Sequence, residues 1–496
     1  MKTLNADLLN HAERHDDSMR FVSFAKKVRP FIGWRAASKT VEQQGNKVGG
    51  HRVEAEQLET FFIEGVSLAD LLAKYPTPVY VTSLGAIEAR TRLYQSELKK
   101  YFPQSQVYYA LKANWAAPVI KTVQTAGEGF DIVSIGELQH LLRLQVDPRT
   151  ICFAGVGKTP AEVQAALEAG VGVLNVEHLA ELALALQLLK KIPSHTKIAL
   201  RLNPALEIET HPHLKTGALD SKFGMLGPAI EEFVVANDVL LRESSALGRP
   251  LVESIAGIHV HVGSQLLTGP IFSKLVRAVA VLSESLLQAG VRVSHLDFGG
   301  GLGVASTGVP DSGQDVVDHV SCLHLALRAV CSENKVLREL WGQNFENVQI
   351  CLEPGRSIVA SSTIFATRVL YTRQNSAAHR FAYVDGGMND FPRPAIYGAQ
   401  HDVVVAEQAR HSRAGDSIAS AWSPVIAGGK GLQIVGPVCE SGDVLRKDAE
   451  LGDVAVGDTL VFLEAGAYCR SMASEYNLRK LPASIFVRGN HVIEDV

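Results

Sequence analysis

The middle of the chain alternates short apolar runs with stretches of helical pattern. Each run ends at a glycine or a polar residue, and eight follow one another at fairly regular spacing: 107–112, 129–134, 150–155, 171–177, 198–203, 257–263, 295–301 and 348–355. Short apolar runs bounded by turn residues are typical of buried parallel strands. Eight strands that alternate with helices are the number that closes a (β/α)8 barrel, TIM-like in architecture. We therefore expect an α/β fold with its chemistry at the C-terminal ends of the strands.

After residue 356 the pattern changes to β-type runs separated by glycine, proline and aspartate, with few helices: 364–371, 381–385, 433–436, 459–463 and 484–488. This indicates a mostly antiparallel β domain, as a barrel or sandwich. Residues 51–84 predict a short helix and strands that pack with it. We expect four parts: an N-terminal extension (1–50) that is flexible or docks a partner, this lead-in (51–84), a barrel (85–356) and a β domain (357–496).

Composition narrows the class of protein. A length of 496 residues exceeds a single barrel, and a net charge of −4 gives no electrostatic footprint for nucleic acid or an anionic membrane. No apolar stretch approaches the length of a bilayer-spanning helix. The six cysteines are scattered without CxxC spacing, which is typical of reduced thiols in a cytoplasmic protein and predicts neither a disulfide framework nor a zinc site.

Lys112 closes the first apolar run. A lysine there points into the mouth of the barrel, where an apolar wall would lower the pKa of its amine and free it for Schiff-base chemistry. The alternative is a surface lysine at a strand end.

Two further signals lie in the sixth run and at the end of the seventh. Gly299-Gly-Gly-Leu-Gly303 would let backbone N–H groups approach a phosphate, or is simply a tight turn. His259 and His261 are two residues apart and share one side of a strand, so either could stack on a flat ring or sit in the core. We expect no metal, because no third ligand follows at suitable spacing.

Glu353 ends the eighth run, where a buried carboxylate needs a partner. A protonated pyridine nitrogen and an internal arginine are the two candidates. An amine for an imine, glycines for a phosphate, a histidine for a ring face and a carboxylate for a ring nitrogen together fit one cofactor, pyridoxal 5′-phosphate.

From about residue 57 onward the chain resembles the fold type III (alanine-racemase-like) pyridoxal-phosphate-dependent decarboxylases. The resemblance rests on motifs in the same order: 109–114, 129–134, 153–159, 210–212, 222–224, 261–265, 297–301, 353–356, 385–390, 393–397, 436–443 and 465–468. It implies that Lys112 binds the cofactor covalently, that His261 stacks on its ring and that Glu353 keeps the ring nitrogen protonated. The phosphate would meet Ser264, Gly300, Gly301 and Tyr468.

The resemblance also implies how substrate is held. Arg356, Arg393 and Tyr397 would clamp a carboxylate remote from the reaction, and Tyr468 would line the same pocket. Cys439 would return a proton to the substrate and Glu440 would contact it, both from the partner subunit of a homodimer with shared active sites.

These roles predict decarboxylation of an amino acid substrate, meso-2,6-diaminopimelate, to L-lysine and CO2. The alternatives are a paralogue that acts on another amino acid with a distal carboxylate or acyl group and a non-catalytic relative that binds the cofactor. A racemase is disfavoured by Glu353. Four departures from the family pattern bear on the substrate, since we expect them near the pocket rim: Ile135, the long stretch 225–256, the segment after Gly303 and the N-terminal extension.

Overall fold

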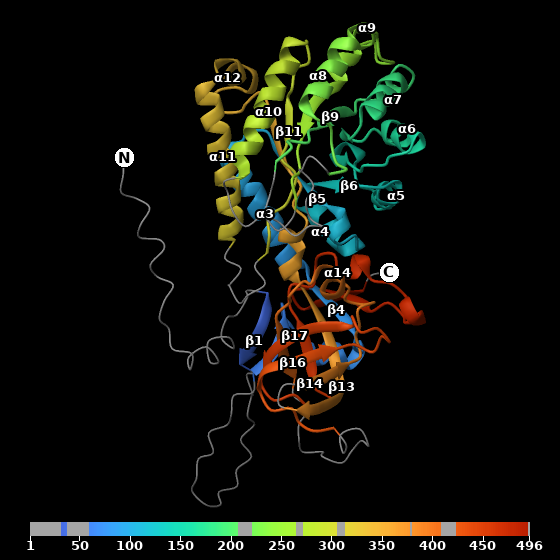
Figure 1. Ribbon diagram of the computed structural model, residues 1–496, viewed down its shortest axis with the longest axis vertical. Coiled ribbons are helices and arrows are strands. Elements are labelled where there is room, and N and C mark those ends of the chain that lie inside the picture. The colour runs from blue at the N-terminus through green and yellow to red at the C-terminus, as the bar shows by residue number, and fades with distance from the viewer. Residues whose placement is uncertain are drawn as a thin grey trace, which may run out of the picture.

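A computed structural model describes residues 31–36, 59–206, 221–263, 271–304, 313–376, 379–407 and 423–494. Figure 1 shows a helix-covered barrel stacked on a part rich in strands. Most of the N-terminal extension, Ser264, the 210–212 motif and most of the segment after Gly303 lie outside the described residues.

The predicted barrel is confirmed. Eight parallel strands close in the order β10-β11-β12-β5-β6-β7-β8-β9, and β12 pairs with β5 at the junction of first and last strands. Each predicted run overlaps one of them: β5 (Ser105–Ala110), β6 (Gly129–Ile132), β7 (Ile151–Phe153), β8 (Val173–Val176), β9 (Lys197–Arg201), β10 (Ile255–His259), β11 (His295–Asp297) and β12 (Gln349–Leu352).

Helices between the strands cover the outside of the barrel. They are α3 (Leu84–Tyr101), α4 (Ala117–Thr125), α5 (Ile135–Arg143), α6 (Pro160–Ala169), α7 (Leu179–Leu189), α8 (Gly227–Ala236), α9 (Asp238–Arg242), α10 (Ile271–Gln288), α11 (Gln314–Glu333), α12 (Lys335–Trp341) and α13 (Arg356–Val359). Local sequence sets several of their starts. Ser83, Ser134 and Thr159 accept hydrogen bonds from the first turns of α3, α5 and α6, and Thr159 with Glu162 completes a capping box.

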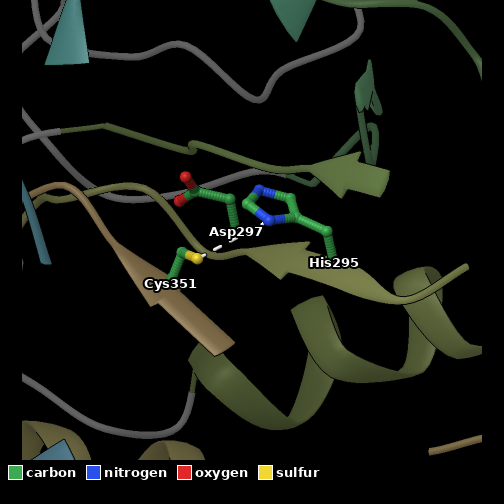
Figure 2. A group of neighbouring side chains, drawn as sticks. All are labelled: His295, Asp297 and Cys351. Atoms are coloured by element: carbon green, nitrogen blue, oxygen red, sulfur yellow. Dashed lines mark hydrogen bonds between the residues drawn. The ribbon is translucent and has the colours of Figure 1, made fainter. Parts of the chain in front are cut away.

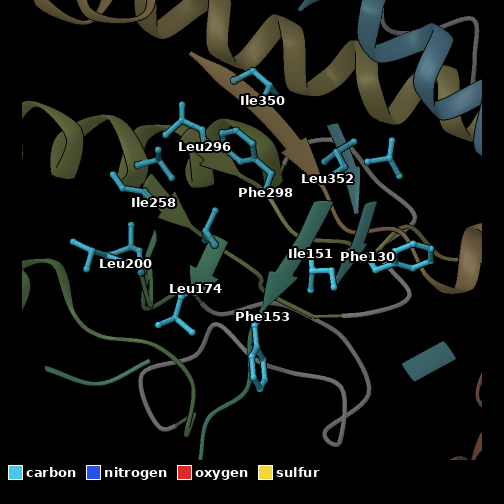
Figure 3. Packing of buried hydrophobic residues seen from close by; sticks show 14 of the residues in the cluster. Phe130, Ile151, Phe153, Leu174, Leu200, Ile258, Leu296, Phe298, Ile350 and Leu352 are labelled. Atoms are coloured by element: carbon cyan, nitrogen blue, oxygen red, sulfur yellow. The ribbon is translucent and has the colours of Figure 1, made fainter. Parts of the chain in front are cut away.

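Strand alternation separates the helix-facing core from the barrel interior. Leu296, Ile350 and Leu352 belong to the apolar cluster shared with the helices, shown in Figure 3. Asp297 and Cys351 fall between them in sequence and therefore face inward. A small separate cluster of buried residues fills part of the barrel interior: Tyr108, Cys152, Val173, Ala199 and Cys351.

The strand-rich part is mostly antiparallel, as expected. Its nine-stranded sheet contains β4 (Val79–Ser83), β13 (Thr363–Ser376), β14 (His379–Val384), β15 (Val403–Glu407), β16 (Gly429–Val435), β17 (Val444–Leu451), β18 (Thr459–Phe462), β19 (Ala483–Arg488) and β20 (His491–Glu494). The lead-in strand β4 lies between β13 and β19. Two pairs in the sheet are parallel and are the exceptions: β19 with β4, and β14 with β16. A smaller sheet joins β1 (Ile32–Ala36), β2 (Glu59–Ile63) and β3 (Val66–Ser67), followed by α2 (Leu68–Lys74).

The long stretch 225–256 begins where we expected, with Met225 bridged to Leu202 just after β9, but most of it lies elsewhere. It forms α8, α9 and a turn that is held to the C-terminal end of α7 by a hydrogen bond from Ala246 N–H to the Leu189 carbonyl. The end of α7 precedes β9, so this turn lies at the N-terminal face of the barrel, opposite the strand ends. Its added length therefore does not shape the rim of the site. No helix among the described residues is both long and apolar enough to cross a membrane.

Candidate active site

One interior layer of the barrel is entirely polar. Its four side chains come from alternate strands or their ends: Asp131 on β6, Asn175 on β8, His259 on β10 and Glu353 just after β12. Barrel interiors are commonly filled by four side chains from alternate strands, usually branched apolar ones. All four are buried here. A buried polar layer at the C-terminal end of the strands marks this face as the site.

Glu353 is the centre of this layer. His259 Nε2 lies 3.1 Å from Glu353 Oε2, and Asn175 Nδ2 donates across 3.4 Å to Oε1. The Cys152 thiol lies 3.8 Å from Oε1. Burial disfavours the charged form, but His259, Lys112 and His261 prevail and hold the pKa of Glu353 below its ordinary value. Glu353 is therefore a carboxylate.

Two other buried carboxyl groups share the interior with Glu353. Burial and the Glu353 charge raise the pKa of Asp297 well above its usual range, and the same two causes raise that of Asp131 to about 7. Asp297 Oδ1 accepts the Gly299 N–H at 2.8 Å. Negative charge is thus concentrated on Glu353, while Asp297 keeps a proton.

Lys112 lies in a single 3-10 turn after β5, with its side chain 41% exposed at the barrel mouth. Its Nζ donates to Asp131 Oδ2 across 2.7 Å. The barrel walls around the amine oppose its charge, yet Asp131, Tyr468 and Glu353 raise the pKa of Lys112 above its ordinary value. The predicted lowering of this pKa is wrong, because the wall beside the amine carries carboxylates.

His261 and the glycine loop are in direct contact. The Gly300 N–H donates to His261 Nδ1 at 3.2 Å, and Gly299, at φ +66°, leaves room for the His261 ring. Burial and Arg201 lower the pKa of His261 to about 3, so its ring is neutral. Gly301 also has a positive φ, +110°, which favours glycine. His261 and the glycine loop predicted to bind the phosphate therefore lie side by side.

The predicted carboxylate clamp is also brought together. Arg356 begins α13 and Arg393 begins α14 (Arg393–Tyr397), and both guanidinium groups are buried. Burial and the neighbouring Arg393 lower the pKa of Arg356 to about 10, against the effects of Tyr468 and Tyr397. Arg356 lies 4.9 Å from the centre of the Tyr468 ring. Two buried positive charges side by side favour an anionic ligand.

A loop from the strand-rich part links this clamp to Lys112. The Tyr468 N–H donates to the carbonyl of Ala113 at 2.9 Å, and the Ser471 hydroxyl donates to the same oxygen at 3.3 Å. Tyr468 has φ +60°, an uncommon value for a tyrosine. The site therefore forms where the barrel and the strand-rich part meet.

Cys439 and Glu440 are not part of this cluster in a single subunit. Both are exposed on the loop between β16 and β17. The hydrogen bond recorded for the Glu440 side chain comes from Tyr476, whose hydroxyl donates across 2.6 Å.

Two triads of buried side chains have metal-ligand chemistry. One is His295, Asp297 and Cys351, shown in Figure 2, and the other is Cys152, Asp297 and Glu353; in each, the three ligand atoms lie within 4.8 Å of one another. Hydrogen bonds already engage these groups: His295 Nδ1 with Gln349 Oε1 at 3.2 Å, and Asp297 with Gly299. We assign no metal to either triad.

Sequence reasoning missed three kinds of contact in the site. Asp131 and Asn175 were not chosen as candidate site residues, although each occupies an inward-facing position of its strand and could have been found from the alternation of inward and outward positions. The buried ion pair between Arg201 and Glu177 was missed, although Arg201 ends β9 and Glu177 directly follows β8. His401, which contacts Arg393, lies in a loop and gave no periodic signal.

The fold and the site define a barrel enzyme of the alanine-racemase-like, fold type III class. The chain belongs to the pyridoxal-dependent decarboxylase family, because the model of its pyridoxal binding domain matches residues 84–360. Curated relatives named diaminopimelate decarboxylase include those of Aquifex aeolicus, 36% identical over 87% of this chain and 91% of that protein, and of Pseudomonas aeruginosa, 34% identical over 87% and 93%.

Solved structures agree. That of diaminopimelate decarboxylase from Helicobacter pylori, complexed with L-lysine, has a TM-score of 0.71 and 30% identity, covering 86% of this chain and 95% of that one. That of diaminopimelate decarboxylase from m. jannaschii, in co-complex with L-lysine, has a TM-score of 0.72 and 28% identity, covering 88% of this chain and 92% of that one.

The residues present fit pyridoxal phosphate, the family's cofactor. A lysine amine, a neutral imidazole and a carboxylate lie at the C-terminal ends of the barrel strands, close enough to shift one another's pKa values, and the glycine loop contacts the imidazole. Asp131 Oδ1 and His259 Nδ1 are buried without hydrogen-bond partners among the described atoms. A site with unmatched buried polar atoms is suited to a polar ligand.

Proposed function

We propose that this chain decarboxylates meso-2,6-diaminopimelate and releases L-lysine and CO2. The observation that carries the proposal is the pair of buried guanidinium groups, Arg356 and Arg393, beside Tyr468 and next to the Lys112 segment. Ornithine and lysine have no remote carboxylate and would leave these charges unpaired. The names of the relatives, and the lysine bound in the Helicobacter pylori structure, support the same substrate.

Pyridoxal phosphate, when bound, supplies an aldehyde that captures amines and an electron-poor ring that accepts the electron pair left when CO2 departs. Lys112 would hold the aldehyde carbon. Its contact with Asp131 keeps the amine charged, and the raised pKa of Asp131, about 7, makes that carboxylate a better acceptor for the proton of the amine than an ordinary aspartate would be. Asp131 is thus the proton acceptor nearest to Lys112 Nζ.

Glu353 would hold a proton on the ring nitrogen. Its carboxylate is ionised and is fixed by His259 and Asn175, so one charge-assisted hydrogen bond to the nitrogen meets little reorganisation. The neutral His261 would lie against the ring, and Ser264, Gly300, Gly301 and Tyr468 would bind the phosphate.

Arg356, Arg393 and Tyr397 would bind the remote carboxylate of the substrate, with Tyr468 lining the pocket. Charge-assisted hydrogen bonds from guanidinium to carboxylate are short and directional, so they orient the other end of the substrate above Lys112. Cys439 would return a proton to the carbon that lost CO2, and Glu440 would contact the substrate, both from the partner subunit of a homodimer.

The exposure of Cys439 and Glu440 on one loop supports this sharing. We also infer a cytoplasmic location, supported by six cysteines that are all free thiols. We propose that the chain divides into an N-terminal extension (1–50), a lead-in (51–84), a barrel (85–356) and a β domain (357–496).

Substrate panels test the proposed reaction. Protein loaded with pyridoxal phosphate is incubated with meso-diaminopimelate, with other amino diacids and with lysine or ornithine, and lysine and CO2 are quantified. We expect lysine and CO2 in equal amounts from meso-diaminopimelate. If the protein turned over only another amino acid, that amino acid would be its substrate in place of meso-diaminopimelate. If it turned over none, the chain would be a non-catalytic protein that binds the cofactor.

A further inference from the structure

His401 connects the arginine clamp to the backbone of the strand-rich part. It lies between α14 and β15 and is 1% exposed. Arg393 Nη1 lies 3.2 Å from His401 Nε2, and His401 Nδ1 lies 2.9 Å from the carbonyl oxygen of Leu463. Phe391 meets the imidazole edge to face, with ring centres 4.7 Å apart.

The partners fix which nitrogen of His401 carries the proton. A guanidinium group can only donate, so Nε2 must accept. A carbonyl oxygen can only accept, so Nδ1 must donate. A doubly protonated ring would place an N–H against the guanidinium, and burial together with Arg393 lowers the pKa of His401 to about 3. The imidazole is therefore a neutral acceptor with one orientation.

The neutral state of His401 matters because a negatively charged acceptor would cancel the positive charge of Arg393. No ion pair is recorded between Arg393 and a carboxylate among the residues that the structure describes, and Arg393 Nε is buried without a hydrogen-bond partner. An aspartate or glutamate at position 401 would also orient the guanidinium, but it would neutralise it. A neutral acceptor fixes Arg393 and leaves its full charge for a ligand.

We propose that His401 is a positioning residue that sets selectivity for substrates with a remote carboxylate, by orienting Arg393 without neutralising it. This inference rests on the proposed function, in which Arg393 binds that carboxylate.

Two variants separate orientation from charge. His401→Leu removes the acceptor, and His401→Asp keeps an acceptor but adds a negative charge. We expect each change to raise KM for meso-diaminopimelate about 10-fold or more, with kcat changed much less: His401→Leu because a hydrogen bond to a charged group is lost, and His401→Asp because the charge of Arg393 is neutralised. His401→Gln, which offers a neutral carbonyl acceptor, should recover part of the loss. His491→Leu, at an exposed position on β20, is the control.

A second readout does not depend on turnover. Pimelate, which has both carboxylates and no amines, should bind to the cofactor-loaded protein, and His401→Leu and His401→Asp should weaken its calorimetric Kd by a similar factor. The visible absorbance of the bound cofactor should not change. Unchanged KM and pimelate Kd in His401→Leu would overturn the proposal, and so would equal losses of kcat, cofactor and thermal stability, which indicate a merely structural role.

Failure of the proposed function is seen separately, in the wild-type protein. Wild type that makes no lysine from meso-diaminopimelate overturns the proposed reaction. Pimelate binding that still depends on His401 in the same protein would retain the role of His401 for a different diacid substrate.

Discussion

Single residues in the barrel interior show how burial and local charge divide protons among similar groups. Glu353, Asp297 and Asp131 are all buried carboxyl groups, yet Glu353 alone has a lowered pKa because His259 lies beside it. Pairs of titratable groups whose pKa values are driven apart are a common feature of catalytic sites. The ionised member here is the one that faces the proposed ring nitrogen.

His295 gives a residue-scale prediction on pH and stability. It is fully buried, and burial lowers its pKa to about 4 despite a hydrogen bond from its ring to Gln349. The unfolded chain binds this proton near pH 6.5, well before the folded chain does, so the contribution of His295 to stability falls as pH falls from about 6.5 to about 4. Between pH 7 and pH 5 the loss should be about 2 kcal/mol.

The test compares urea unfolding of wild type and His295→Gln at both pH values. The variant has no titrating group at position 295. On acidification from pH 7 to pH 5, the free energy of unfolding of wild type should therefore fall about 2 kcal/mol further than that of the variant. His491→Gln, at an exposed histidine, should follow wild type at both pH values. If the free energy of unfolding of His295→Gln fell with pH as much as that of wild type, the pKa assigned to His295 would be wrong.

At the scale of elements, most of the barrel could be predicted because its signal is local. Each apolar run carries its own turn residues and its own inward and outward positions, so the strands and Lys112, His261 and Glu353 at their ends could be located. The partners of Lys112 could not. The pKa of its amine depends on Asp131, which lies on the neighbouring strand, and no local pattern reports the charge of a neighbour.

Other features were missed or only partly predicted for reasons of distance along the chain. The lead-in 51–84 was expected to pack with the β domain, but the particular pairing of β4 with β13 and β19, hundreds of residues later, leaves no periodic signal. The extra turn before β10 was placed at the wrong face, because length alone does not say at which end of a barrel a loop is added. His401 lies in a loop, so only the folded structure connects it with Arg393.

The loop after β11 gives an element-scale prediction. A Cβ at Gly300 would collide with the backbone carbonyl oxygen of Glu353, whose own N–H bonds to the Gly299 carbonyl at 2.7 Å. Gly300→Ala should therefore displace both the glycine loop and Glu353, and weaken pyridoxal phosphate binding about 10-fold or more, as expected for overpacking that costs 1–3 kcal/mol.

Titration of the cofactor by absorbance measures this change. Gly136→Ala, in the first turn of α5, is a matched control because its Cβ would meet its nearest neighbour, Ser134 Oγ, at an ordinary 3.8 Å. The control should bind the cofactor as wild type does. Equal affinity of Gly300→Ala and wild type would mean that the loop does not border the cofactor.

The whole molecule brings the site together from two parts that are separate in sequence. Lys112 and Glu353 come from the barrel, whereas Arg393 and Tyr468 come from the strand-rich part, and β4 from the N-terminal side completes that part's sheet. Hydrogen bonds from Tyr468 and Ser471 to the Ala113 carbonyl join the two parts directly beside Lys112. A change in how these parts pack would therefore alter substrate binding and the position of Lys112 together.

The proposed sharing of sites between subunits predicts complementation between inactive variants. Lys112→Ala removes the amine and Cys439→Ala the proton donor, so each homodimer alone should be almost inactive. If Cys439 serves the partner's site, a mixed dimer has one site that lacks both groups and one that is intact. Random exchange of equal amounts gives half mixed dimers, so about a quarter of wild-type activity should return. A mixture of Lys112→Ala with Glu353→Gln, two residues of the same subunit's site, should recover none. Recovery in the second mixture as well would mean that pairing merely stabilises the variants, whereas recovery in neither would mean that Cys439 does not act across the interface.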